Sequence, residues 1–280
     1  MRHMSEIVRI DAAGRAFDIE CAFVGSEKPD APLIVFLHEG LGSVAMWRDF
    51  PQALCDAVQA RGLVYSRPGY GGSTPRAADE PWGVDFMHVQ AREVLPALLR
   101  ALNVAVPVWL LGHSDGGSIA LIHAALFPDQ VAGVIAVAPH LFVEDISISS
   151  IAATREAYLT PNPKAPLKAK LARFHKDVDS AFWGWNDIWL NPAFRVWNIE
   201  PLLPQITCPV LAIQGVDDEY GTMAQIDRIA HALPTAKLLK LEHCGHSPHR
   251  DQPEAVIYAV RKFMAETARQ APPQRLDILR

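Results

Sequence analysis

The sequence predicts an α/β protein with a mainly parallel sheet, helices on both faces and a helical cap insertion. Short apolar runs alternate with longer runs of helical periodicity over most of the 280 residues. Some of the short runs, such as Leu33–Leu37 and Val131–Val137, are almost continuously apolar. Strands of a parallel sheet have this composition because both of their faces are buried.

The first half of the chain carries the opening strands and two helices. Apolar residues at helical spacing between Met46 and Val58 predict the first helix. A second helix is expected over Asp85–Leu102, where Pro96 implies a kink or a late start because proline has no amide proton. The strands expected around them are Ile7–Ile10 and Ala16–Val24 as an antiparallel pair, then Leu33–Leu37 and Leu63–Tyr65.

The second half begins with a strand, a short Gly-rich turn and a helix. The strand is expected over Val106–Leu111, and the helix covers Gly117–Phe127 and is ended by Pro128. The remaining strands are expected at Val131–Val137, Val210–Ile213 and Lys237–Leu241, with a closing helix over Glu254–Thr267.

Residues 141–204 break this alternation and predict a helical cap. The segment contains no convincing strand, and it has a proline-rich bend at Pro161, Pro163 and Pro166. Four of the seven tryptophans lie in it, namely Trp183, Trp185, Trp189 and Trp197. The cap would separate the first part of the core, residues 1–140, from the second, residues 205–268, and a tail over 269–280 is expected to be frayed.

Composition and charge exclude several classes of partner. The formal net charge is −5 and no long run of Lys or Arg occurs, which argues against binding to nucleic acid or to an anionic membrane. The N-terminal residues lack the apolar segment of a signal peptide, and no stretch of about 18 apolar residues occurs. A cytoplasmic protein is therefore expected, and a homodimer remains open.

The cysteines and histidines do not predict a disulfide or a metal site. The four cysteines, Cys21, Cys55, Cys208 and Cys244, lie far apart and suit reduced thiols. A metal could bind the set His243, Cys244, His246 and His249, but no second cluster of ligands accompanies it. No phosphate-binding loop occurs, and Gly69–Thr74 lacks the later glycine of a dinucleotide loop, so neither metal nor cofactor is expected.

The five residues from Gly112 to Gly116 fit the Gly-x-Ser-x-Gly nucleophile elbow, with Ser114 at its centre. A predicted strand precedes them and a predicted helix follows, which is the context that this motif requires. Such a sharp turn brings the strand and helix backbones close together, and Gly112, Gly116 and Gly117 leave room for that approach. Ser114 is therefore the candidate nucleophile.

A serine nucleophile needs a base and an acid, which in this fold follow it in the order acid, then histidine. Asp217 and Asp218 come after the strand that ends at Ile213, and His246 comes after the strand that ends at Leu241. His249 is a second candidate for the base, and Glu144 or Asp145, which follow the strand Val131–Val137, for the acid. The side chain of His113 should point away from Ser114 and serve as a packed neighbour of the elbow.

With these motifs the chain resembles the α/β-hydrolase superfamily from about residue 15 to 268, as a capped, serine esterase-like member. The elbow, the Gly-x-x-Asp loop at Gly215 and the Cys-Gly-His loop carry the resemblance, together with His38-Glu39-Gly40 and the Arg-x-Gly-x-Gly-x-Ser turn at Arg67. It implies that the acid is Asp218 rather than Asp217. It also implies an oxyanion hole formed by the amides of Asp115 and Gly40.

Glu39 departs from the superfamily, in which most members have glycine after this histidine. A carboxylate beside an oxyanion site opposes anion formation unless it points away or pairs with a cation. Glu39 is expected either to brace loops such as those of Arg67 and Arg76 or to recognise a polar or cationic substrate group. The other candidates for substrate binding are His38, Trp183, Trp185 and Trp189, although most of the cap tryptophans should form the cap's own core.

These features predict hydrolysis of a small acyl compound. Relatives that cleave carbon–halogen or epoxide bonds have aspartate in place of Ser114, so the substrate should contain an acyl group. A carboxylic ester with an apolar or aromatic group is the first expectation, because the cap is rich in aromatics. Lactones, thioesters and carbon–carbon bonds remain open, and so does a ligand receptor on the same fold.

Overall fold

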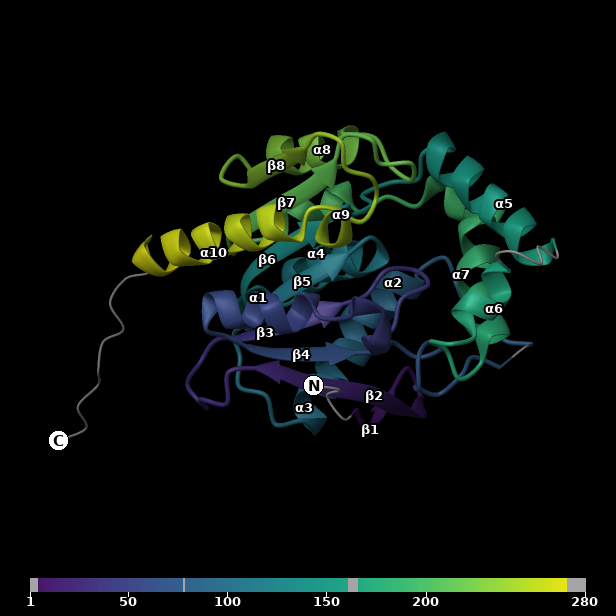
Figure 1. Ribbon diagram of the computed structural model, residues 1–280, viewed down its shortest axis with the longest axis horizontal. Helices are drawn as coiled ribbons and strands as arrows, with labels where there is room; N and C mark the ends of the chain where they lie inside the picture. Colours follow the sequence, from purple (N-terminus) through teal and green to yellow (C-terminus); the bar gives the residue numbers. More distant parts are fainter. Residues whose placement is uncertain (1–4, 78, 161–165, 271–280) are drawn as a thin grey trace.

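The computed structural model describes residues 5–77, 79–160 and 166–270, and their strands form one eight-stranded sheet (Figure 1). The spatial order is β1-β2-β4-β3-β5-β6-β7-β8, in which β2 runs antiparallel to both β1 and β4 and the other pairs are parallel. The strands are β1 (Glu6–Ala12), β2 (Arg15–Gly25), β3 (Leu33–Leu37), β4 (Arg61–Tyr65), β5 (Val108–His113), β6 (Val131–Val137), β7 (Val210–Gly215) and β8 (Lys237–Leu241).

Helices cover both faces of the sheet. One face packs against α1 (Phe50–Val58) and α10 (Pro253–Gln270), and the other against α3 (Leu95–Ala101), α4 (Asp115–Leu126) and α8 (Ala224–Ala232). This arrangement confirms the predicted α/β fold with a mainly parallel, doubly covered sheet.

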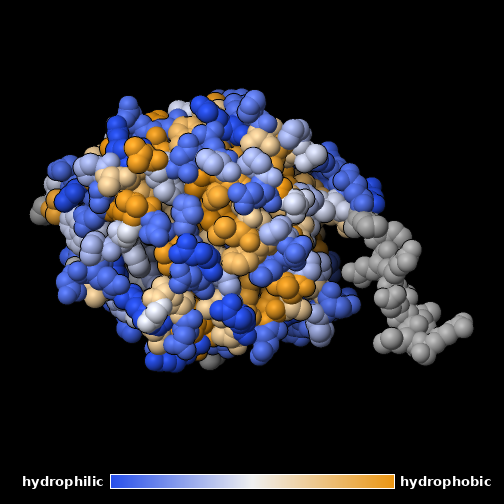
Figure 2. Space-filling model, turned by 180° about the vertical axis from the view of Figure 1, so that it is seen from behind, coloured by the Kyte–Doolittle hydropathy of each residue, from blue (hydrophilic) through white to orange (hydrophobic). Residues whose placement is uncertain are grey.

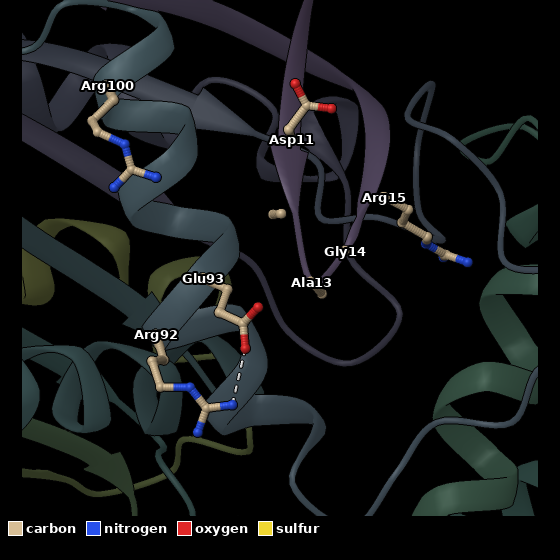
Figure 3. Close-up of a pocket in the computed structure, with 8 residues that line it drawn as sticks. Asp11, Ala13, Gly14, Arg15, Arg92, Glu93 and Arg100 are labelled. Atoms are coloured by element: carbon tan, nitrogen blue, oxygen red, sulfur yellow. Dashed lines mark hydrogen bonds and ion pairs between the residues drawn. The ribbon is translucent and has the colours of Figure 1, made fainter.

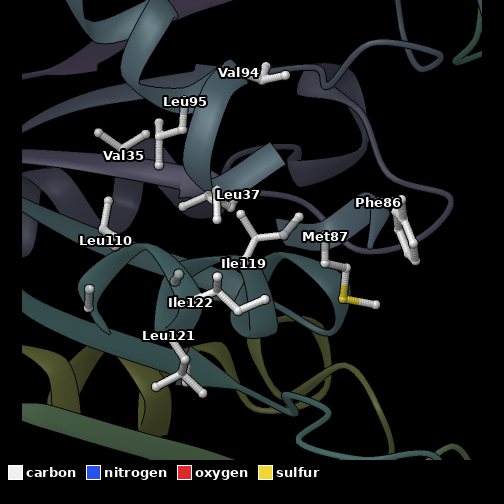
Figure 4. Packing of buried hydrophobic residues seen from close by; sticks show 14 of the residues in the cluster. Val35, Leu37, Phe86, Met87, Val94, Leu95, Leu110, Ile119, Leu121 and Ile122 are labelled. Carbon is white, nitrogen blue, oxygen red and sulfur yellow. The ribbon is translucent and has the colours of Figure 1, made fainter. Parts of the chain in front are cut away.

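The side chains of β3 show why a central strand is apolar at every position. Val35 and Leu37 point into the core shared with α3 and α4, whereas Ile34 and Phe36 point into the core shared with α1 and α10. In Figure 4, Leu37 lies close to Ile119 of α4, whereas Val35 lies close to Leu95 of α3. Because both faces are buried, no position on this strand tolerates a polar side chain.

The helix predicted over Asp85–Leu102 is divided into three segments. It begins as α2 (Phe86–Val89), continues as a π-helical segment over Gln90–Val94, and ends as α3. Pro96 cannot donate the amide hydrogen bond of a regular helix, and the irregular segment lies immediately before it. The helix expected over Asp85–Leu102 thus begins at Phe86 and contains a π-helical segment that ends two residues before Pro96.

The ends of β5 differ from the expected ones. β5 begins at Val108 rather than Val106, and Pro107, which has no amide proton for the ladder, precedes it. The same strand continues to His113, so Ser114 follows it directly. The short helix α9 (Pro248–Asp251), like α8, was not among the predicted elements.

In the described part of the segment between β6 and β7, the regular elements are helices and 3-10 turns, with one isolated bridge between Phe142 and Asn198. Its elements are α5 (Asp145–Leu159), α6 (Leu167–Leu171) and α7 (Val178–Trp189), followed by 3-10 turns over Pro192–Val196 and Glu200–Gln205. In Figure 1 these helices stand together beyond one end of the sheet. The cap boundaries stay a prediction, and Pro161, Pro163 and the tail from residue 271 lie outside the described residues.

Figure 2 shows apolar patches between hydrophilic side chains on the face opposite that of Figure 1. Within the described ranges, no helix is both long and apolar enough to cross a membrane. The cysteines Cys21, Cys55, Cys208 and Cys244 are free thiols.

Candidate active site

Ser114 lies at the junction of β5 and α4 in a strained backbone conformation. Its φ of 53° and ψ of −120° place it in a region that residues with side chains rarely adopt. Such a conformation costs about 1–3 kcal/mol and persists only where the surroundings impose it. Here the amide of Ser114 donates to the carbonyl oxygen of Val137 at 2.9 Å, and that of Gly117 donates to the carbonyl oxygen of Ser114 at 2.8 Å.

The glycines beside Ser114 are required by close backbone contacts. A Cβ atom at Gly116 would lie 2.0 Å from the carbonyl oxygen of Leu37, and one at Gly112 would lie 2.1 Å from that of Gly116. No side chain fits at these distances. The glycine pattern of the elbow thus reflects the packing of α4 against β5 and β3.

His246 and Asp218 meet in hydrogen-bond contact. Nδ1 of His246 lies 2.8 Å from Oδ1 and 3.0 Å from Oδ2 of Asp218. Since a carboxylate only accepts hydrogen bonds, Nδ1 carries the proton and Nε2 is left as an acceptor. Asp218 follows β7 and His246 follows β8, so these two parallel strands bring the pair together.

The Asp218 carboxylate is held in its charged form although its side chain is only 1% exposed. Burial by itself would raise its pKa, but the hydrogen bond and charge of His246 and the amide of Tyr220 lower the pKa below the usual value. The Tyr220 amide donates to Oδ1 at 2.8 Å, and Nε2 of Gln214 donates to Oδ2 at 3.2 Å. Asp218 can therefore fix the orientation of the His246 ring.

The alternative acids have other partners. Glu144 accepts hydrogen bonds from the amide and hydroxyl of Thr222 at 2.9 and 2.6 Å. Asp145 pairs with Arg195 at 2.6 Å, and Asp217 is exposed. The structure thus brings Asp218, and none of these three, to His246.

His249, the second candidate for the base, is buried in a cluster of aromatic rings and does not line the pocket. It is 2% exposed, and its ring lies among those of Trp47, Phe50 and His113 at centroid distances of 4.9, 5.4 and 4.6 Å. Burial and the nearby charge of His113 keep its pKa well below the usual value, so it is a neutral aromatic neighbour.

Ser114 and His246 line one pocket of about 170 Å³ together with Gly40 and Asp115. The amides of Gly40 and Asp115 have no acceptor among the described residues. The other residues that line the pocket are Glu39, Leu41, His113, His140, Ile151, Trp185, Trp189, Tyr220, Ser247 and Arg250. The pocket therefore combines a hydroxyl, a base and two free amides with aromatic walls.

Glu39 lines this pocket, but its carboxylate already has basic partners. Its Oε1 accepts from Nη2 of Arg250 at 3.1 Å, and its Oε2 lies 3.4 Å from Nδ1 of His113. Arg67, expected as a partner of the carboxylate, instead donates to the backbone oxygen of Glu39 at 2.9 Å, and Arg76 donates to the carbonyl oxygens of Ala77 and Glu80. Glu39 does brace neighbouring loops, through partners that the sequence did not indicate.

The side chain of Asp115 is fully buried beside the elbow. Trp189 donates from Nε1 to its Oδ1 at 3.1 Å, and Arg67 lies 3.5 Å from its Oδ2. Burial raises the pKa of Asp115, and Arg67 and Trp189 oppose this shift. Trp189 therefore links α7 to the residue that follows Ser114.

Two residues predicted to bind substrate lie elsewhere. His38 is fully buried, where Nδ1 donates to the Glu39 oxygen at 2.7 Å and Nε2 accepts from the Arg67 amide at 2.9 Å. Trp183 lies across α7 from the pocket and packs against Phe182 and Arg155. Of the cap tryptophans, Trp185 and Trp189 line the pocket, because α7 turns these two side chains towards it.

The sequence did not point to His140, Tyr220 or Arg250, although all three line the pocket. His140 follows β6, and burial lowers its pKa to about 3, so its ring is neutral. Its position at the carboxyl end of a parallel strand was the available signal. Arg250 is four residues after His246, and only the folded chain shows that it meets Glu39.

A larger hollow of about 440 Å³ lies at the turn between β1 and β2 (Figure 3). Charged side chains surround it, and Nη2 of Arg92 donates to Oε1 of Glu93 at 2.9 Å. Its lining residues include none of the candidate catalytic residues. Among the described residues, no group of three or more His, Cys, Asp or Glu side chains is placed to hold a metal ion.

Comparison with known proteins supports the fold. The model of the alpha/beta hydrolase family matches residues 34–260. A protein of Pseudomonas savastanoi pv. phaseolicola named "putative carbamate hydrolase RutD" is 29% identical over 242 residues, which cover 80% of this chain and 90% of that protein.

Two further similarities extend over most of the chain. The 2-hydroxy-6-oxo-6-phenylhexa-2,4-dienoate hydrolase of Burkholderia cepacia is 25% identical, with 83% of this chain and 87% of that protein covered. The structure of a thermophilic esterase from Thermogutta terrifontis superposes with a TM-score of 0.71 at 20% identity, covering 94% of this chain and 99% of that chain. At this identity the superposition establishes the fold.

Proposed function

The chain belongs to the alpha/beta hydrolase family, and we propose that it is a serine hydrolase that cleaves a carboxylic ester or related acyl compound. Ser114 is the proposed nucleophile, His246 the base and Asp218 the acid that orients the base. The amides of Asp115 and Gly40 form the proposed oxyanion hole. The substrate is a small molecule with an apolar or aromatic group.

The observation that carries this proposal is the hydrogen bond of 2.8 Å from His246 to Asp218 in a pocket that also holds Ser114. Asp218 fixes the His246 tautomer so that Nε2 can accept the proton of the Ser114 hydroxyl. The serine oxygen then attacks the acyl carbon, and the oxygen of the acyl group becomes negatively charged. Two amides without other acceptors are suited to stabilise that charge.

Water then hydrolyses the acyl-enzyme formed in this step. His246, now protonated, gives its proton to the leaving alcohol and then removes a proton from the incoming water. Attack of the hydroxide on the acyl carbon passes through the same oxyanion site. The acid is released and Ser114 recovers its proton.

The preference for an apolar or aromatic group rests on the walls of the pocket. Ile151 of α5 and Trp185 and Trp189 of α7 line the pocket that also contains Ser114. Burial of an aromatic or medium aliphatic group against such walls strengthens binding by about 1.5–3 kcal/mol. Acetyl compounds lack this contribution.

Carbon–carbon bond hydrolysis is the second candidate. A relative 25% identical over 83% of this chain is named as a dienoate hydrolase, and the same three residues could serve that reaction. Lactones and thioesters require the same chemistry at the acyl carbon, so the triad does not separate these substrates.

The test is turnover of a panel of aryl and alkyl esters, lactones, thioesters and vinylogous diketones by the purified chain, with Ser114→Ala as the control. Multiple turnovers of at least one acyl compound that are lost in Ser114→Ala would support the proposal. Tight binding of a ligand with negligible turnover would favour a receptor instead.

A further inference from the structure

Glu39 places a carboxylate next to the proposed oxyanion site. It directly precedes Gly40, lines the pocket with Ser114, and its side chain is 16% exposed. A fixed negative charge opposes a developing oxyanion, and the opposition is strong because the surroundings are largely buried. A reaction through an oxyanion at this place requires that the charge of Glu39 be cancelled.

A cation and a histidine meet the two oxygens of this carboxylate. Nη2 of Arg250 donates to Oε1 at 3.1 Å and to the carbonyl oxygen of Met46 at 3.2 Å. Nδ1 of His113 lies 3.4 Å from Oε2, and its Nε2 donates to the carbonyl oxygen of His246 at 2.8 Å. These contacts leave neither oxygen of Glu39 without a basic neighbour.

The same contacts connect three loops of the proposed site. Glu39 precedes the oxyanion amide of Gly40, His113 precedes Ser114, and Arg250 lies in α9, four residues after His246. Gly42 leaves space for the carboxylate, since a Cβ atom there would lie 2.5 Å from Oε2. One carboxylate therefore ties the oxyanion loop to the elbow and to the loop of the base.

The charge of Glu39 is maintained by these partners. Burial would raise its pKa, but the interactions of Glu39 with His113 and with the charge of Arg250 hold the pKa well below the usual value. A substrate cation would thus find both oxygens already engaged. This occupation favours a role inside the protein over recognition of a cationic substrate.

We propose that Arg250 is a positioning residue for the reaction assigned to Ser114: it holds the Glu39 carboxylate in place and cancels its charge at the oxyanion site. The inference rests on the proposed function. Arg250 acts through Glu39, because its side-chain hydrogen bonds among the described residues are to Glu39 and to the Met46 carbonyl oxygen. The Arg250 side chain also connects α9 to the loop that contains Glu39 and Gly40.

The test compares the parent with Arg250→Met, Glu39→Gln and the double variant. Two rates are measured: kcat and KM on an aryl ester, and the second-order rate of labelling of Ser114 by an aryl fluorophosphonate, which also forms a negatively charged transition state. Arg250→Met should lower kcat and the labelling rate about tenfold to a hundredfold, with a smaller change in KM. Both rates of the double variant should be higher than those of Arg250→Met and close to those of Glu39→Gln, because the double variant no longer has the negative charge of Glu39.

Arg228→Met is the matched control, since Arg228 pairs with Glu200 at the same distance of 3.1 Å away from the pocket. It should leave both rates unchanged, and thermal unfolding of each variant monitors the fold. The inference is overturned if the double variant is as slow as Arg250→Met, or if Arg250→Met is as fast as the parent. Labelling of the parent at Ser114 would still support the proposed function in either case. Failure of the parent to be labelled overturns both.

Discussion

The two walls of the pocket are held by different forces. On the sheet side, Ser114 owes its position to the backbone, with a φ of 53° and glycine contacts that exclude any Cβ atom. On the helical side, Trp185 and Trp189 are positioned by side-chain packing, and the ring of Trp189 lies 4.8 Å from that of His140. The proposed catalytic groups are thus fixed by strand ends, whereas the positions of the proposed substrate-contacting tryptophans depend on how α7 packs. Substitutions on the sheet side and on the helical side should therefore have different effects on activity.

The largest effect is expected on the sheet side at Ser114. Ser114→Ala should lower kcat on the best substrate by roughly a million-fold, because loss of the nucleophile removes the covalent step. The fold should persist, since the strained backbone and its glycine neighbours are unchanged, and thermal unfolding checks this. Activity within tenfold of the parent, in a preparation free of other esterases, would refute the assignment of the nucleophile.

The acid should show the next largest effect, with a matched control in the adjacent residue. Asp218→Asn should lower kcat on the order of a thousand-fold or more, because the amide no longer holds the His246 ring in the required tautomer. Asp217→Asn should have a far smaller effect, since Asp217 is exposed. Equal small effects, with a large loss at Glu144 or Asp145, would place the acid after β6.

On the helical side we expect changes in selectivity rather than in chemistry. Aromatic esters should exceed acetyl esters in kcat/KM by about tenfold to a hundredfold, and Trp185→Ala should reduce that ratio. Trp183→Ala is the control, because Trp183 lies on α7 outside the pocket and should alter stability alone. An unchanged ratio in Trp185→Ala would mean that the tryptophans serve only to build the helical wall.

The smallest effect concerns stability in acid. The pKa of Asp218 is lower in the folded chain than its usual value of 3.8, so its contribution is present above that pH and is lost as pH falls through the folded pKa. Below about pH 3.8 the free energy of unfolding of the parent should fall more steeply than that of Asp218→Asn. Urea unfolding at a series of pH values measures this, and parallel profiles would contradict it.

The central strands and the elbow could be predicted because local chemistry dictates them. Burial on both faces requires the apolar runs of β3 and β6, and the approach of α4 to β5 and β3 requires glycine at 112 and 116. Edges of elements were less predictable: Pro107 delays β5, and Pro96 follows a π-helical segment in the helix expected over 85–102. These deviations depend on which backbone groups find partners in the folded chain.

The sequence by itself determined the α/β fold, the place of Ser114 and the order of the three candidate catalytic residues, since each follows a strand of recognisable composition. Only the tertiary structure decided that Glu39 meets Arg250, 211 positions away, and that Trp185 rather than Trp183 lines the pocket. The physical reason is that the residues of a motif are dictated by the backbone geometry and packing of the turn in which they lie. Contacts between loops depend on how the whole sheet brings the strand ends together, and no local pattern contains that information.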